Sequence, residues 1–417
     1  MLLSRNIQNL LAYSIFLYLI VYDFLFFNLE DILNIKLFVF KTYFELLLFS
    51  MIIVYFFYVT KFFKFHKLLI FLFVFISFNL IYGIIANKDI VATVKDFRLF
   101  FLPIIICVLF YYLKILELIN VRKLLIFYIF ISVILILYGF YEYIIFDGSV
   151  DSIWRYEFLL QAKRELDPDF LDHRVLYQVL RDGSIRVASI FISALDWAFY
   201  LSTFGILIFI MILKLRNFYF IPLFIVILFS LYISQVRTGF ILLSLAIVIY
   251  FLINSRIKII RRLSFYVPFI AIIGTFLIML TGSSLNDTST LGRLVQHFQL
   301  ITELTVFGSG LGKHAFSFDS LYIYIFLTYG VFSILFFYLQ YWIINKLIIV
   351  NNNMRKINFN RYEIVLTQFM IIFHLVSLYL FAFQHTLGAP TFFILYFFSF
   401  IILSKANYKL KKEALCE

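Results

Sequence analysis

The chain has 417 residues, of which 64% are hydrophobic and only 14% are charged. A soluble domain is closer to half apolar and a quarter charged, so this composition excludes an ordinary soluble protein. The net charge of +12 does not indicate a nucleic-acid partner, because the basic residues are spread over short connections and form no clustered patch. The two cysteines, Cys107 and Cys416, give neither a disulfide framework nor the spacing of a metal site.

Apolar runs long enough to cross a bilayer recur from end to end. They do not alternate with polar residues as the strands of a membrane β-barrel would, so they predict an all-α polytopic integral membrane protein. The first run, at about 9–27, is too long for the apolar part of a signal peptide and is expected to remain as a span. We expect about twelve transmembrane helices in a single polytopic membrane domain over residues 1–417. Their expected ranges are 8–28, 37–59, 68–86, 97–113, 124–145, 188–212, 217–234, 238–254, 265–281, 320–344, 362–383 and 389–404.

The lysines and arginines of the short connections predict the orientation of the chain. They concentrate in alternate connections, which the positive-inside rule assigns to the cytoplasm together with both termini. The two long polar segments, 146–187 and 282–319, are therefore expected to lie outside, since long loops are translocated regardless of their charge. The first of them mixes charged and apolar residues, which favours amphipathic helices on the membrane surface over a solvated loop without regular structure.

Several polar residues lie where expected spans meet the outer face, and they are candidate ligands for an anion. Any one of the cations can simply extend to lipid phosphates. Arg237 is harder to explain in that way, because the positive-inside rule gives a tight outer turn no use for a positive charge. Arginine binds phosphate oxygens in a bidentate manner and stays charged at low dielectric, so the set predicts a clamp for a lipid-linked pyrophosphate. Its members are Lys95, Arg98, Arg186, Gln235, Arg237 and Arg293.

Charged or titratable side chains within the expected spans are few. Each would be costly against lipid, so each is expected to face the bundle interior or an aqueous cleft. Asp196 is expected about three turns beyond Arg186 on one helix, either as the partner of an arginine or as part of a site. The residues concerned are Asp23, Glu45, Glu142, Asp196 and His374.

The stretch from Phe307 to Tyr322 ends the second long segment and contains three alternating glycines, followed by a lysine, a histidine and an aspartate. Polar residues that a membrane protein keeps at the bilayer edge are candidates for function. The alternative for the glycines is a mobile loop with a glycine turn. The residues concerned are Gly308, Gly310, Gly312, Lys313, His314 and Asp319.

Three pieces of sequence carry a resemblance to a known family. The first is Arg186-Val-Ala-Ser-Ile-Phe-Ile-Ser193, and the second is the tight turn Gln235-Val-Arg-Thr-Gly239. The third combines Arg293 with Phe307-Gly-Ser-Gly-Leu-Gly312, Asp319-Ser-Leu-Tyr322 and Tyr329-Gly330. In this order they make the region of roughly 180–400 resemble the Wzy-type O-antigen polymerase and O-antigen ligase superfamily.

The resemblance implies a metal-independent glycosyltransferase that needs no cofactor. Its donor would be an undecaprenyl-pyrophosphate-linked oligosaccharide at the outer face of the bacterial inner (cytoplasmic) membrane, and its arginines would hold the pyrophosphate leaving group. Fixed guanidinium groups suit this task because the charge of the leaving group develops as the glycosidic bond breaks. Asp319, or His314 in its place, would accept the proton of the acceptor hydroxyl. Membrane lipids are expected partners and a chain-length regulator protein is a further candidate, whereas nucleic acid is not.

The function that we expect is a polysaccharide (O-antigen) polymerase, which joins the lipid-linked glycan to another lipid-linked repeat unit. A ligase of the same superfamily transfers glycan to a lipid or protein acceptor and typically has a histidine where this chain has Asp319, so the polymerase is favoured. A glycolipid transporter or flippase would carry charges along its spans and repeated halves, and neither is clear in this sequence. Asp319 has a structural alternative as well, the N-cap of the span that follows it.

Overall fold

A computed structural model describes residues 5–33, 67–112, 116–149, 153–156, 179–181, 183–280, 288–313, 319–354, 356–384 and 390–413. The expected span 37–59, with Glu45, and the candidate base His314 lie outside these residues. Nearly all the secondary structure in the described ranges is helical, which confirms the all-α class. The exception there is a short antiparallel hairpin formed by β1 (Leu180–Arg181) and β2 (Ser184–Ile185).

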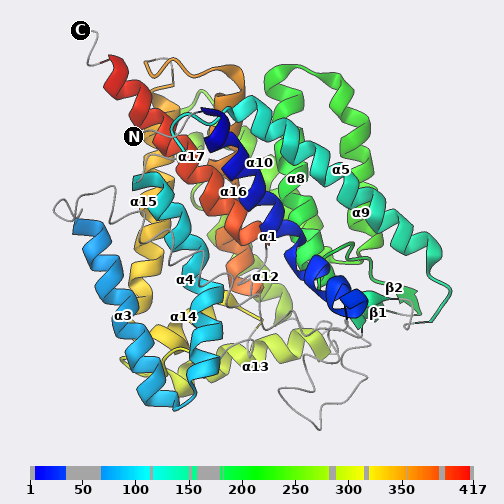
Figure 1. The fold of residues 1–417 in the computed structure, drawn as a ribbon, viewed down its shortest axis with the longest axis vertical. Helices are drawn as coiled ribbons and strands as arrows, with labels where there is room; N and C mark the ends of the chain where they lie inside the picture. The colour runs from blue at the N-terminus through cyan, green and yellow to red at the C-terminus, as the bar shows by residue number, and fades with distance from the viewer. Residues whose placement is uncertain are drawn as a thin grey trace. The chain divides into compact units, whose positions relative to one another are not determined.

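The chain divides into two compact units, each made of three separate stretches of sequence. Unit 1 consists of Met1–Leu48, Ile115–Ile247 and Met354–Phe369. Unit 2 consists of Phe49–Lys114, Val248–Asn353 and Met370–Glu417. Each unit therefore brings together residues that are far apart in the chain (Figure 1).

Unit 1 is built around a helix that is buried along most of its length, α8 (Ala194–Leu215). Its fully buried side chains include Trp197 and Tyr200. The two helices that follow approach each other and α8 closely because Gly239 has no side chain: a Cβ there would lie 2.7 Å from Leu231 Cδ2 and 3.2 Å from Ser202 Oγ. The Ser202 hydroxyl donates to the Gly239 carbonyl oxygen at 2.9 Å. The other helices of unit 1 are α1 (Arg5–Leu33), α5 (Val121–Ile145), the 3-10 helix η2 (Phe218–Phe220), α9 (Ile221–Ile233), most of α10 (Arg237–Ile253) and the start of α16 (Arg361–Phe383).

Unit 2 is organised by a long helix near the C-terminus, α17 (Pro390–Glu413), which packs against α4 (Ile90–Tyr112) and α15 (Ser333–Asn352). α4 also packs against α3 (Lys67–Asn87), the helix before it. Buried aromatic residues such as Phe373 and Tyr396 fill the interior of this unit. Its remaining elements are α11 (Lys258–Leu263), α12 (Val267–Met279), α13 (Thr288–Glu303), α14 (Leu321–Tyr329), the 3-10 helix η3 (Gly330–Phe332) and the second half of α16.

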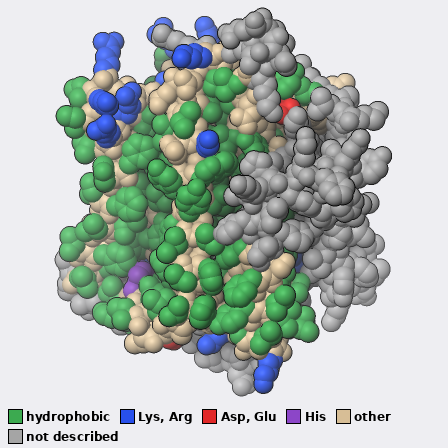
Figure 2. All heavy atoms as spheres, turned by 90° about the vertical axis from the view of Figure 1, so that its left-hand side faces the viewer, with side chains coloured by type: hydrophobic (Ala, Val, Ile, Leu, Met, Phe, Trp, Pro, Cys, Tyr) green, Lys and Arg blue, Asp and Glu red, His purple; other side chains and the backbone are tan. Residues whose placement is uncertain are grey.

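The apolar helices are those of a multi-pass membrane protein. Five helical runs in the described residues are long and apolar enough to cross a membrane: Val121–Ile145, Ala194–Leu215, Leu321–Asn352, Arg361–Phe383 and Thr391–Leu410. Helices also lie on each of the other expected spans that the structure describes. The face seen in Figure 2 is mostly hydrophobic, with Lys and Arg side chains gathered near its upper end. The count of twelve spans and the orientation in the membrane stay predictions.

Two of the expected spans are corrected in detail. α8 begins at Ala194 and not at 188, because the Ser193 hydroxyl caps it by accepting from the Leu195 N–H at 3.1 Å. Arg186 is consequently not on the same helix as Asp196, contrary to our expectation. The run expected at 320–344 extends to Asn352 and is interrupted at Gly330, whose φ of +52° ends α14.

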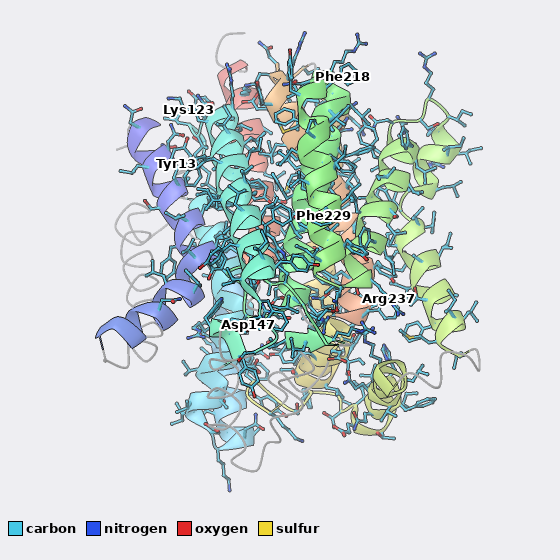
Figure 3. All side chains as sticks on the ribbon, turned by 90° about the vertical axis from the view of Figure 1, so that its right-hand side faces the viewer. Tyr13, Lys123, Asp147, Phe218, Phe229 and Arg237 are labelled. Carbon is cyan, nitrogen blue, oxygen red and sulfur yellow. The ribbon has the colours of Figure 1, made fainter. Side chains whose placement is uncertain are left out.

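The first prediction concerns orientation, and it uses the two ends of α5. Lys123 and Asp147 are exposed, and they lie at opposite ends of unit 1 (Figure 3). Single cysteines at these positions, with Cys107 and Cys416 replaced by serine, should differ in their reaction with a membrane-impermeant maleimide. We expect Asp147→Cys to react in intact spheroplasts and Lys123→Cys to react only after lysis. The reverse pattern would invert the orientation, and labelling of both in intact cells would contradict a spanning α5.

Candidate functional site

The glycine-rich stretch forms a tight turn, the glycine turn (Val306–Gly312), which completes the broken helix of unit 2. The break at Gly330 deprives the last carbonyls of α14 of their helical partners. The turn supplies new donors: the Ser309 N–H donates to the Leu327 carbonyl at 2.8 Å, and the Gly310 N–H donates to the Thr328 carbonyl at 3.1 Å. These contacts favour a fixed turn over a mobile loop.

A second set of hydrogen bonds holds the opposite side of the glycine turn to α3 and α4. The Tyr82 hydroxyl donates to the Gly308 carbonyl at 3.1 Å, and Asn87 Nδ2 donates to the Leu311 carbonyl at 2.7 Å. The buried carboxylate of Asp96 accepts from the Gly312 N–H at 2.8 Å. The turn is therefore bonded on both sides within unit 2.

The conformation of the turn explains why glycine stands at its alternate positions. Gly308, Gly310 and Gly312 have φ values of +74°, +81° and +95°, in the region that L-residues with a side chain rarely adopt. A Cβ on Gly308 would overlap the Thr328 carbonyl, and one on Gly312 would lie 2.8 Å from the Thr93 nitrogen. Two separate constraints, backbone conformation and space, thus exclude larger residues.

Asp319 and Arg293 form the pair of candidate catalytic and binding residues that the structure brings together. Arg293 Nε lies 3.8 Å from Asp319 Oδ2, and the two side chains are 26% and 58% exposed. The Gln296 side-chain oxygen accepts from the Asp319 N–H at 2.9 Å. The N-cap of α14 is Ser320, whose hydroxyl accepts from the Ile323 N–H, so the alternative that Asp319 caps this helix is wrong. The Asp319 carboxylate is left accessible at the start of α14.

The other candidates in unit 2 lie on α4. Lys95 and Arg98 flank Asp96 in sequence, and the Arg98 side chain is half-buried. Their helix thus carries both predicted cations and the carboxylate that holds the glycine turn. The bond between Asp96 and the glycine turn was not predicted, although a carboxylate at the edge of a span was a visible signal.

Unit 1 holds the remaining candidates around its tight turn. Gln235 adopts a left-handed φ of +56°, and its amide donates to the Ser184 hydroxyl of the hairpin. Arg237 begins α10 and is exposed, with no carboxylate partner in the part of the chain that the structure describes. A helix N-terminus disfavours a cation, so an arginine placed there gains most when an anion is also present. Figure 3 places Arg237 at the end of unit 1 that also carries Asp147.

Unit 1 contains a buried ion pair that the sequence did not predict, although its acidic member, Glu142, was recognised as a charge within a span. The Arg155 guanidinium, from the first long segment, bonds the Glu142 carboxylate of α5 and the Arg186 carbonyl oxygen. The same carboxylate accepts from the N–H groups of Ala188 and Ser189 at 3.0 and 2.9 Å. Burial lowers the pKa of Arg155, and the adjacent carboxylate opposes that shift. Glu142 therefore faces the interior, as expected, and fixes the backbone around Arg186.

The other charged or titratable residues noted within spans lie in positions that the fold itself explains. His374 is buried in unit 2 between the Gln340 side chain, at 3.0 Å, and the Ser399 hydroxyl, at 2.8 Å. Asp196 lies in the first turn of α8, where the helix dipole favours an acid. The side chain of Asp23 lies outside the described residues.

Comparison with known proteins gives no relative: no family model, no curated protein and no solved structure matches this chain. The interpretation of the site consequently depends on its own residues and geometry.

The second prediction tests the glycine turn against a matched control. Gly308 and Gly183 have nearly equal φ values, +74° and +77°, but nothing lies within 4 Å of a Cβ on Gly183. Alanine at either position carries the strain of a left-handed backbone, of about 1–2 kcal/mol. Only Gly308→Ala adds a steric overlap, so it should destabilise the protein by roughly 1–3 kcal/mol more. The measurement is thermal unfolding of both variants in detergent.

Equal melting temperatures for Gly308→Ala and Gly183→Ala would contradict the close packing of the turn on α14. A third variant, Gly274→Ala, controls for substitution at a helical glycine with open space around it. Replacement of glycine in a helix removes backbone freedom in the unfolded chain, so this variant should melt at or above the wild-type temperature.

Proposed function

We propose that this protein is a metal-independent glycosyltransferase that polymerises an O-antigen-type polysaccharide at the outer face of the bacterial inner membrane. Its donor is an undecaprenyl-pyrophosphate-linked glycan, and its acceptor is a second lipid-linked repeat unit. The observation that carries the proposal is the accessible Asp319–Arg293 pair at the start of α14, a helix whose other end is hydrogen-bonded to the glycine turn.

Asp319 supplies the base that such a transfer needs. The acceptor sugar hydroxyl must lose a proton as it attacks the anomeric carbon of the donor, and a positioned carboxylate is suited to accept it. Asp319 is more than half exposed, and its backbone is held by Gln296, so a substrate hydroxyl can reach it without a rearrangement of the fold. A single carboxylate acting as base agrees with direct displacement and inversion at the anomeric carbon.

Arginines stabilise the departing pyrophosphate. The negative charge on the leaving group grows as the glycosidic bond breaks, and guanidinium groups fixed beforehand stabilise that charge at little cost of reorganisation. Arg293 lies next to the proposed base Asp319 in unit 2. Arg237, exposed at a helix N-terminus in unit 1, is a separate candidate for the same role. The Arg155–Glu142 pair supports Arg186, the third arginine, through its backbone.

The surroundings of the buried charges support an enzyme over a transporter. A transporter of a charged glycolipid needs polar groups along its path through the membrane. Glu142 and His374, two titratable side chains that are buried within spanning helices, are instead occupied by hydrogen-bonding partners. The exposed candidates Arg237 and Asp319 lie at a helix start and in a loop.

The third prediction is the activity itself. Deletion of the gene in the native host should make the lipid-linked repeat unit accumulate, and this material can be purified as substrate. Full-length protein in liposomes should convert it into a ladder of lipid-linked polymer, detected by gel electrophoresis and mass spectrometry. Transfer only after addition of a lipid or protein acceptor would indicate the ligase instead. Movement of the substrate across the bilayer without a new glycosidic bond would indicate a flippase.

Two pairs of variants make this assay specific. Asp319→Asn should lower polymerisation by roughly 10²–10⁴-fold, while Glu303→Gln, at an exposed carboxylate on α13, should leave it unchanged.

Arg237→Ala should abolish the ladder and Arg237→Lys should restore little, because lysine lacks the planar fork that binds two phosphate oxygens. Full activity of Asp319→Asn would remove the base assignment without removing the polymerase.

A further inference from the structure

The helix α13 has two edges of opposite character. Val295, Phe298 and Ile301 follow one another at intervals of three residues, and their exposed fractions are 49%, 65% and 76%. Gln299 and Glu303, four residues apart, are exposed on the adjoining side. The helix therefore presents an apolar edge and a polar edge to its surroundings at the same time.

The apolar edge is not the side by which α13 is attached to unit 2. The attached side contains His297, whose ring centroid lies 4.7 Å from that of Phe276 of α12. Leu300 packs against the buried pair Ile323 and Leu327 of α14. Because the helix is already seated by these residues, the fold of unit 2 does not explain the exposed apolar edge.

The exposed apolar surface continues beyond the end of the helix. Leu304, Val306 and Phe307 are exposed by 52%, 69% and 57%. They follow directly in the chain and lead into the glycine turn. We name the six residues Val295, Phe298, Ile301, Leu304, Val306 and Phe307 the apolar edge of α13.

The direction of α13 places it along the surface of a membrane. Figure 1 shows it crosswise to the long helix α3 of the same unit, and Figure 3 shows it nearly end-on. Its contact with α12 is at Phe276, close to the end of that helix at Met279. A helix that crosses the ends of membrane-spanning helices lies parallel to the bilayer plane.

The neighbouring helix identifies what covers the apolar edge. α12 is apolar throughout and exposes Ile270, Ile273 and Ile278 by 63%, 60% and 67%. In a multi-pass membrane protein such a surface faces lipid, so lipid is present next to α13. An amphipathic helix in that position partitions its apolar edge into acyl chains and its polar edge into water.

We propose that α13 is an interfacial helix whose apolar edge lies among lipid acyl chains, so that Arg293 on the same helix is held at the depth of the lipid phosphate groups. The occupant of the surface is the bilayer itself. The proposal does not depend on glycosyl transfer, but it gives a physical reason for the level at which the Asp319–Arg293 pair lies.

The test compares the two edges within one helix. Single cysteines at Phe298 and Ile301, and as matched controls at Gln299 and Glu303, are placed in full-length protein in which Cys107 and Cys416 are serine. Each is labelled with a bimane fluorophore and reconstituted in phosphatidylcholine and phosphatidylglycerol vesicles with or without brominated acyl chains. We expect several-fold stronger quenching at 298 and 301 than at 299 and 303, with bromines near the headgroup quenching best.

Three results would overturn the proposal. Equal quenching at all four positions would mean that α13 lacks an interfacial orientation. Weak quenching at 298 and 301 in vesicles, with cross-linking between copies through the same cysteines, would mean that a second copy covers the edge. Weak quenching without cross-linking would place the edge in water. Because no substrate is present, none of these outcomes depends on the proposed polymerase, whose failure is recorded only in the activity assay.

Discussion

The interruption of the helical run at Gly330 is the constraint from which the geometry of unit 2 follows. A helix that ends inside an apolar protein leaves carbonyl oxygens without donors, and each unsatisfied buried group costs about 1–3 kcal/mol. The glycine turn removes this cost by bringing two N–H groups to the carbonyls of Leu327 and Thr328. In return, the Val331 N–H donates to the Val306 carbonyl at 2.9 Å, so the two segments satisfy one another's backbone hydrogen-bonding groups.

This mutual capping determines where the candidate catalytic residues lie. The glycine turn connects α13, which carries Arg293, to the segment that ends at Asp319. The turn is bonded to the C-terminal end of α14 on one side and to Asp96 on the other, and Arg293 and Asp319 belong to the elements that flank it in sequence. A catalytic carboxylate and its arginine need that kind of support, since misplacement by about 1 Å is enough to lose most of a catalytic effect.

The sequence predicted the helices better than the connections between them. Long apolar runs identify membrane helices because only a helix satisfies its own backbone in lipid. The same rule says nothing about a break such as Gly330, which depends on donors from a distant turn. The sequence left Asp319 as an alternative N-cap although the adjacent Ser320 serves, because both residue types cap well.

Polar contacts between residues far apart in the chain could not be predicted from the sequence either. Glu142 was recognised as a charge within a span, yet its pairing with Arg155 depends on how the first long segment lies against α5. The role of Asp96 likewise depends on a contact with Gly312, 216 positions away. Such pairs are set by tertiary structure, so composition and spacing indicate that a partner exists without naming it.

The most direct test of this account is hydrogen exchange in the glycine turn. A peptide covering residues 306–312 should exchange slowly, because its N–H groups at Ser309, Gly310 and Gly312 are bonded to α14 and Asp96. The control is the exposed loop at Asp147–Ser149, which should exchange much faster. Slow exchange of the turn that becomes fast in Gly308→Ala would support the account. Exchange of the wild-type turn as fast as that of the control loop would contradict it.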